Sequence, residues 1–110
     1  MSQNQISIGC FSAQTGLSVR ALRLYDEVGL LKPALVNRHN KYRYYQSEQI
    51  VRAKQIKFYR EYSLPLEDIR DILEHPQKAQ NILQNHLERL QQEVAKQQHL
   101  IGQIQTLLGQ

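Results

Sequence analysis

Arginine, lysine and tyrosine side chains occur in the first half of the chain at spacings that suit contact with a polyanion. Arg20 and Arg23 are three residues apart, so they share one face of any helix that contains them. Arg43 lies in a short run of tyrosines, and Lys57 and Arg60 are again three residues apart. A guanidinium group can form two parallel hydrogen bonds with guanine O6 and N7 or with a phosphate. These side chains therefore favour nucleic-acid recognition over catalysis.

The distribution of charge along the chain supports the same interpretation. Residues 1–60 contain ten lysine or arginine side chains against three acids, whereas residues 61–110 contain four against seven. Such asymmetry favours a polyanion-binding first half joined to a second half with another task. From charge alone, a solvated basic surface that binds nothing is an equally good alternative.

Other kinds of chemistry find little support in the sequence. Cys10 is the single cysteine, which excludes an intramolecular disulfide and is typical of a reducing cytoplasm, the location we expect. We expect Cys10 to be a small buried hydrophobe rather than a redox or metal ligand. The four histidines lack the spacing of metal ligands, and the sequence has no glycine-rich phosphate loop or catalytic triad. We therefore expect no enzyme, metal or cofactor, and no membrane span, since no stretch approaches about 18 apolar residues.

The elements that would position the first arginines are two short helices. Ser7 is expected to cap a helix over residues 8–14, and Ser18 to cap a second helix over residues 19–28 that ends at Gly29. Two short helices joined by a glycine-containing turn form a helix-turn-helix, whose second helix enters the major groove of DNA. Arg20 and Arg23 would lie on that second helix.

A basic hairpin and two further helices are expected next. Residues 35–36 and 42–45 are strand formers around a polar tip, in which Asn37 and Asn40 are able to adopt a positive φ. A hairpin in this position is a wing. Ser47 is expected to cap a helix over residues 48–62, and Pro65 to begin a helix that ends near residue 73.

The last third of the chain carries a regular apolar pattern that predicts one long helix from about residue 77 to residue 108. At 1.5 Å per residue this helix would be ~45 Å long, and its apolar positions alternate spacings of four and three, as in a coiled coil. Folding back onto the rest of the chain is the less favoured alternative. Gln97 is either a device that fixes the register or a tolerated, partly exposed glutamine. The positions expected to form the dimer contact, which we call the seam, are Leu83, Leu87, Leu90, Val94, Gln97, Ile101, Ile104 and Leu108.

Several runs of residues resemble the MerR family of bacterial transcription regulators. The matching runs are Ile8–Gly9, TGLSVRALRLYDEVGLLKP over 15–33, YRYY over 42–45 and LEDIRDIL over 66–73. The most specific run extends from Leu22 to Pro33, where an arginine and an aromatic residue precede an acid pair and Gly-Leu-Leu. The resemblance covers residues 6–75 closely and the remaining helix by its architecture.

The resemblance implies both a fold and a mechanism. The fold would be mainly α, with a winged helix-turn-helix over residues 1–76 that has a β-hairpin wing and a second, helical wing. A coiled-coil helix over residues 77–110 would pair antiparallel with its twin. The homodimer would bind an inverted-repeat operator and distort a promoter whose two elements are set too far apart, so that RNA polymerase can use both. Phosphate contacts would offset the energy of deformation.

Eight side chains are expected to contact DNA, by their chemistry and by this resemblance. Arg23 and Tyr25 come first, although a core position is the alternative for Tyr25. Ser18 is nearly as well explained as a simple helix cap, and Lys57 and Arg60 as solvated surface charges. The full set of expected DNA contacts is Ser18, Arg20, Arg23, Tyr25, Tyr42, Arg43, Lys57 and Arg60.

The chain also departs from the family pattern. Leu24 stands where a tyrosine is usual, Cys10 and Phe11 replace an acid and a smaller aliphatic residue, and Lys41 stands where a glycine often precedes the wing tyrosine. The family branch that it resembles most has an effector domain after the coiled coil, and the printed sequence ends at Gln110. A fragment of a longer protein and a short regulator both fit, and no effector is assigned. The alternative function is an interaction or architectural module whose coiled coil recruits another partner.

Overall fold

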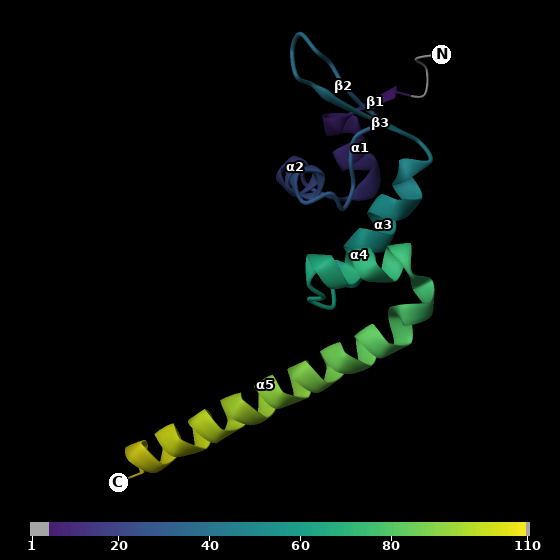
Figure 1. The fold of residues 1–110 in the computed structure, drawn as a ribbon. Helices are drawn as coiled ribbons and strands as arrows, with labels where there is room; N and C mark the ends of the chain where they lie inside the picture. Colours follow the sequence, from purple (N-terminus) through teal and green to yellow (C-terminus); the bar gives the residue numbers. More distant parts are fainter. Residues whose placement is uncertain (1–4, 110) are drawn as a thin grey trace.

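The computed structural model describes residues 5–109, which form a compact head and one long projecting helix. The molecule measures 71 × 33 × 21 Å along its principal axes, and the long helix accounts for the largest extent (Figure 1). Mainly helical structure with a small sheet confirms the predicted fold class. The elements in chain order are β1 (Gln5–Ser7), α1 (Ile8–Thr15), α2 (Val19–Glu27), β2 (Leu35–Val36), β3 (Arg43–Gln46), α3 (Gln49–Arg60), α4 (Leu66–Glu74), a 3-10 turn (Pro76–Lys78) and α5 (Ala79–Leu108).

The helix-turn-helix forms as its capping residues predict. The Ser7 hydroxyl accepts a hydrogen bond from the Cys10 amide at the start of α1, and the Ser18 hydroxyl accepts one from the Ala21 amide at 3.0 Å at the start of α2. Gly16 after α1 has a φ of 79° and Gly29 after α2 has a φ of 77°. Both turns need the left-handed conformation that glycine adopts at little cost.

The small sheet has one strand more than the sequence analysis predicts. Its order is β1-β3-β2, with both neighbouring pairs antiparallel, so the hairpin strand β3 lies in the middle. The prediction missed β1, which is only three residues long and pairs Ile6 with Tyr45. A strand this short carries almost no alternation of its own, and it exists because β3 offers a free edge.

The tip of the wing corrects one expectation. Lys41, and neither Asn37 nor Asn40, adopts a positive φ, at 65°. The Asn37 side chain instead accepts hydrogen bonds from the amides of His39 and Asn40, and the Asn40 side chain accepts one from Tyr42. The asparagines build the turn with their side chains, which leaves the strained backbone position to a lysine.

The core of the head lies between α1, α2, α3, α4 and the inner face of the sheet. Phe11 stacks on Tyr45 with ring centroids 4.3 Å apart and an interplanar angle of 7°. Because Phe11 takes the inward side of α1, Cys10 is exposed, so the prediction of a buried cysteine is wrong. The buried apolar residues are Phe11, Leu17, Leu22, Tyr25, Leu30, Leu31, Tyr45, Ala53, Ile56, Leu64, Ile69 and Ile72.

The two helices that follow the wing differ slightly from their predicted starts. Glu48, rather than Ser47, occupies the cap position of α3, and no side chain there bonds the helix end. Pro65 precedes α4 as its cap residue, and Glu67 and Asp68 lie in the first turn, where the helix dipole favours negative charge. The two helices lie in contact, and both contribute to the buried core, Ala53 and Ile56 from α3 and Ile69 from α4.

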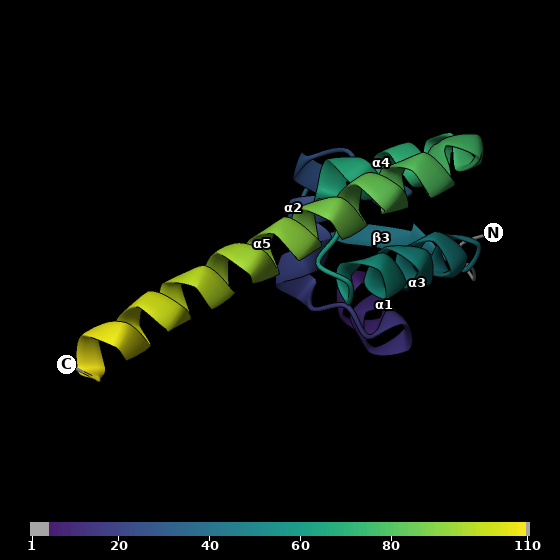
Figure 2. The same cartoon turned by 90° about the horizontal axis from the view of Figure 1, so that it is seen from below.

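Within residues 5–109, the long helix α5 meets the other elements only near its start. Ala79 and Ile82 pack against the edge of the core, and His86 is 8% exposed. Beyond this point α5 runs away from the other elements (Figure 1), and its C-terminal half projects past the head in the view from below (Figure 2). We refer to residues 5–74 as the head and to α5 as the rod.

Candidate nucleic-acid interface

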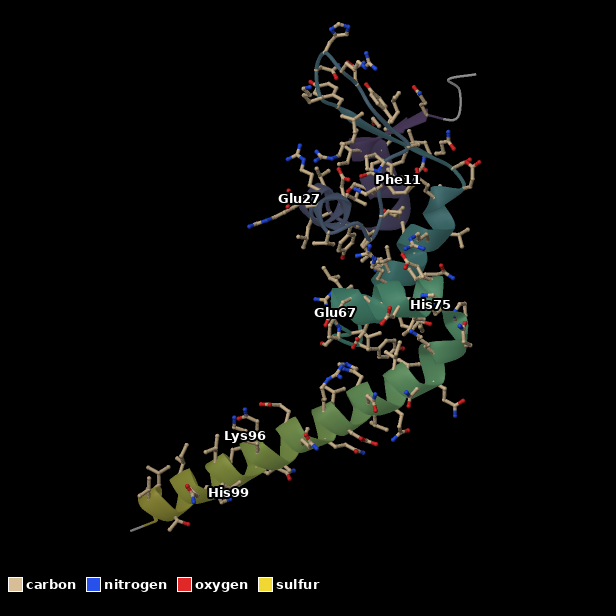
Figure 3. All side chains as sticks on the ribbon, in the orientation of Figure 1. Phe11, Glu27, Glu67, His75, Lys96 and His99 are labelled. Carbon is tan, nitrogen blue, oxygen red and sulfur yellow. The ribbon has the colours of Figure 1, made fainter. Side chains whose placement is uncertain are left out.

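The outward face of α2 carries a stripe of exposed side chains. Arg20, Arg23, Leu24 and Glu27 are exposed at helical spacing, whereas Leu22 and Tyr25 on the opposite face are buried. Figure 3 shows the same division, with Glu27 on the outer side of α2 and Phe11 inside the head. The stripe, together with Ser18 and Ala21, borders one shallow depression. The face of α2 that points away from the core is therefore rich in side chains able to bond bases and phosphates.

Ser18 lies at the start of this stripe and acts as a helix cap. Its oxygen accepts the amide hydrogen of Ala21, while its side chain remains exposed. The hydroxyl proton is thus still available to a phosphate oxygen near the positive end of the helix dipole. The cap and a phosphate contact are compatible at this position.

Tyr25 lies in the core of the head. Its side chain is 5% exposed, and burial raises the pKa of its phenol, with the positive charge of Arg60 acting in the opposite direction. Its carbonyl oxygen accepts the amides of Leu30 and Leu31 and so shapes the turn after α2. These observations favour the core alternative for Tyr25 over a direct DNA contact.

Arg43 joins the wing to α2. Its Nε donates to Oδ2 of Asp26 at 2.8 Å, and both side chains are largely buried, with exposed fractions of 26% and 19%. Lys32 approaches the other Asp26 oxygen at 3.7 Å. A partly desolvated charged hydrogen bond of this kind holds the wing at a fixed angle to α2. Tyr42, beside it on the wing, is 63% exposed and available for contact.

Lys57 and Arg60 on α3 already have partners within the chain. The Lys57 ammonium lies 3.2 Å from a Glu61 carboxylate oxygen, and its stem lies so close to Gly16 that a Cβ there would be 2.8 Å from Lys57 Cε. Arg60 donates from Nη1 to the carbonyl oxygen of Leu64 at 2.6 Å. Lys57 therefore lies beside the turn of the helix-turn-helix, whereas Arg60 stabilises the loop between α3 and α4.

The sequence analysis missed the hydrogen-bond donors that hold the loop after α2. Arg52 Nε donates to the Leu30 carbonyl at 2.9 Å, Arg70 Nη1 to the Val28 carbonyl at 3.1 Å, and Gln49 to the Lys32 carbonyl at 2.6 Å. The sequence gives only a general signal for these donors. The carbonyl groups of an irregular loop need hydrogen-bond donors from other parts of the chain. Which distant side chain supplies each donor depends on the tertiary fold.

A second missed set of residues connects the rod to the head. His86 Nε2 lies 2.8 Å from the Tyr62 carbonyl oxygen, while its Nδ1 lies 3.1 Å from Arg89 Nη2. The same Arg89 nitrogen donates to Asp68 at 3.0 Å. In sequence, His86 is one polar residue beside an apolar seam, and only the packing of the rod against the loop between α3 and α4 gives it partners.

The seam residues themselves are exposed in the single chain. The apolar members of the seam are between 40% and 81% exposed, and Gln97 is exposed as well. Figure 3 places Lys96 and His99 on this same stretch of α5, where no other element runs beside the rod. Among residues 5–109, no helix is long and apolar enough to cross a membrane. The residues that the structure describes also bring no three potential metal ligands together.

A family model supplies the deciding comparison, because the model of MerR HTH family regulatory proteins matches residues 6–76. The chain belongs to the MerR family. That assignment confirms the resemblance and makes the chain a member of a family of helix-turn-helix regulatory proteins. The match covers the head of this MerR-family chain from Ile6 onward, including the interface described above.

One named relative and two solved structures are similar to this chain over both the head and the rod. The chain is 36% identical over 109 residues to the transcriptional regulator BrlR of Pseudomonas aeruginosa, covering 94% of this chain and 40% of BrlR. The crystal structure of MtaN, the N-terminus of the Bacillus subtilis multidrug transporter activator, is 28% identical with a TM-score of 0.77, covering 94% of this chain and 97% of that one. A cryo-EM structure of an EcmrR–DNA complex has 25% identity and a TM-score of 0.80, covering 94% of this chain and 38% of EcmrR. The MerR-family chain thus spans less than half of BrlR and of EcmrR.

Proposed function

We propose that this chain binds an inverted-repeat operator as a homodimer and distorts a promoter with an overlong spacer so that RNA polymerase can use both promoter elements. The observation that carries the proposal is the exposed seam, because the head has its own complete core while the seam leaves seven large apolar side chains in contact with water. Such an arrangement is stable when a second rod covers the first. The regulator would act where promoter DNA is found, in the bacterial cytoplasm.

The position of the rod favours a dimer with two separated heads. The rod leaves the head at the end opposite the wing and α2 (Figure 1). If two rods pair antiparallel along their seams, the heads lie at opposite ends of the pair and present two copies of α2. A two-fold symmetric protein of this kind matches an inverted repeat in DNA.

Each head would bind its half-site through α2 and the wing. Arg20 and Arg23 are exposed on the outer face of α2, where they can reach base edges and phosphates in the major groove. Tyr42 and the wing would contact the sugar-phosphate backbone alongside. Contacts at two points that are fixed relative to each other can support a bend in the DNA between them. EcmrR was solved as a complex with DNA, which agrees with this proposal.

A charge placed inside the seam tests the proposal. Leu90→Asp and Ile101→Asp each put a carboxylate where the partner rod would pack. We therefore expect both variants to sediment as monomers and to lose tight binding to the operator, which is the duplex that the unmodified chain selects from a random pool. Gln92→Asp is the matched control, because Gln92 is exposed and lies on the opposite side of the rod. A seam variant that remained a dimer with normal operator affinity would contradict the proposal.

The promoter part of the proposal needs a separate measurement. Duplexes selected by the chain from a random pool should contain an inverted repeat, and such a repeat can be placed in promoters that differ only in spacer length. We expect transcription to rise with added protein when the spacer is overlong and to fall when it is of ordinary length. Selection of single or directly repeated half-sites would instead favour the interaction module.

A further inference from the structure

A row of apolar side chains runs along the exposed side of α2. Ala21, Leu24 and Val28 follow one another at spacings of three and four residues, so they share one side of the helix. The Val28 amide donates to the Leu24 carbonyl oxygen at 3.0 Å, which continues the helical geometry to Val28. Leu24 and Val28 are 43% and 41% exposed, whereas Leu22 of the same helix is fully buried. The core of the head therefore does not account for Leu24 and Val28.

The two ends of the row lie against other parts of the head. Ala21 is half-buried and packs against the core, and Val28 borders a groove beside the start of α4. Leu24, in the middle of the row, borders the shallow depression that also contains Arg20 and Arg23. Leu24 is therefore a large apolar side chain that shares an exposed surface with both arginines of α2.

The charge around Leu24 favours DNA as the molecule that covers it. Within residues 5–109, the exposed side chains of Arg20 and Arg23 form no hydrogen bond or ion pair. They remain able to bond phosphates or guanine, in contrast with Lys57, whose ammonium already lies beside a Glu61 carboxylate. An apolar surface of another protein would leave both guanidinium groups without a partner, whereas DNA supplies anions beside an apolar contact.

The side chain of Leu24 is suited to one of the four bases. The major-groove edge of thymine carries a C5 methyl group, whereas the other bases present hydrogen-bond donors and acceptors there. Leucine offers no hydrogen bond in return, so its contact with a polar base edge would remove water without replacing the lost bonds. Contact with the methyl group instead buries apolar surface on both sides. The chemistry of Leu24 therefore favours thymine.

We propose that Leu24 recognises a thymine in each half-site by packing against its C5 methyl group. The proposal rests on the DNA-binding function proposed above and assigns one specificity-determining residue of α2. Arg20 and Arg23 would hold the helix on the duplex through their charges. Leu24 would distinguish thymine from the other bases at one position of the half-site.

Deoxyuridine tests the contact, because it differs from thymidine only in lacking the C5 methyl group. Each thymine of one half-site of the operator is replaced in turn by deoxyuridine, and the affinity is measured by titration at one salt concentration. We expect one of these replacements to weaken binding by the unmodified chain about fourfold, the effect of burying one methyl group less. Leu24→Ala should bind the thymine and the deoxyuridine duplexes equally well.

Leu35→Ala is the matched control, because Leu35 is also 43% exposed but lies on the wing strand β2. This variant should keep the difference between thymine and deoxyuridine. The role of Leu24 is overturned, and the operator proposal left in place, if the unmodified chain is insensitive to every replacement, if Leu24→Ala keeps the full difference, or if Leu35→Ala also loses it.

The arrangement of the half-sites separates this inference from the proposed function. Selection of directly repeated half-sites would overturn the inverted-repeat operator, and the deoxyuridine comparison within one half-site would still decide the role of Leu24. A chain that selects no duplex from the random pool would overturn both.

Discussion

The head and the rod bury their apolar residues in opposite ways. In the head, Phe11, Leu22 and Tyr45 are fully buried among side chains of the same chain, and the arginines mostly bond carbonyl oxygens or acids nearby. In the rod, residues of the same chemical types, such as Leu90 and Ile101, are 43% and 53% exposed. The head is therefore a complete folding unit, whereas the rod is one half of a helix pair. A mutation should affect folding in the first region and association in the second.

The largest expected effect is in the core of the head. Phe11→Ala removes the ring that stacks on Tyr45, so we expect it to lower the free energy of unfolding by about 3–5 kcal/mol. Urea unfolding at a fixed protein concentration measures the loss. The matched truncation in the rod is Ile101→Ala, whose loss of apparent stability should be small at protein concentrations below the dissociation constant of the dimer and rise to a plateau above it. If the loss of stability depended on protein concentration equally in both variants, the distinction between a self-contained head and a pairing rod would be contradicted.

The next largest effect is expected on DNA binding, with folding left unchanged. Arg23→Ala removes an exposed guanidinium from the outer face of α2, so we expect specific binding to weaken by about 1–3 kcal/mol while the dimer persists. Titration of the selected operator at one salt concentration gives the affinity, and sedimentation gives the mass. Glu27→Gln is the control, because it changes a charge on the same stripe without removing a donor from it. An unchanged footprint for Arg23→Ala would refute its role.

A gain in stability is expected at Tyr45. Its hydroxyl is buried and has no hydrogen-bond partner among the residues that the structure describes, so Tyr45→Phe should stabilise the head by about 1 kcal/mol. Burial, reinforced by the charge of Asp26, raises the pKa of this phenol. The folded state thus keeps a proton that the unfolded state loses above about pH 10, so stability should fall as pH rises past that value. Tyr45→Phe should lose less stability there, and a destabilised variant at neutral pH would contradict this account.

The smallest effect is expected at the tip of the wing. Lys41 has a φ of 65°, so Lys41→Gly should relieve backbone strain and stabilise the chain by about 0.5–1 kcal/mol. Thermal unfolding measures the change. Lys41→Ala is the control, since it removes the same charge but keeps a side chain at a positive φ. Equal stability of the two variants would show that charge, and not strain, dominates at this position.

The elements that the sequence predicts best are those with strong local signals. Ser18 and Gly29 mark the ends of the recognition helix through capping and a left-handed turn, which involve only neighbouring residues. The seam of the rod is equally local, since its period runs for many turns. The strand β1 and the exposure of Cys10 were not predictable in this way, because β1 depends on the free edge of β3 and the exposure of Cys10 depends on which face of α1 the rest of the head covers.

The residues of the candidate interface show the same difference between features set by neighbouring residues and features set by the tertiary fold. The exposed arginines of α2 follow from helical spacing once Leu22 is placed in the core. The bonds of Arg43 to Asp26, Arg60 to Leu64 and His86 to Tyr62 join residues brought together by the tertiary fold or by an irregular loop. Sequence spacing identifies which side chains carry charge, but it does not tell which of them are already bonded within the protein.

The mass of the protein on DNA tests the central claim most directly. The chain would be bound to a duplex that carries the selected inverted repeat, and the mass of the complex would be measured by sedimentation equilibrium over a range of protein concentrations. We predict two chains on each duplex and a dimer in the absence of DNA. A single chain per duplex, with free protein that remains monomeric, would contradict the pairing of the rods and the function built on it.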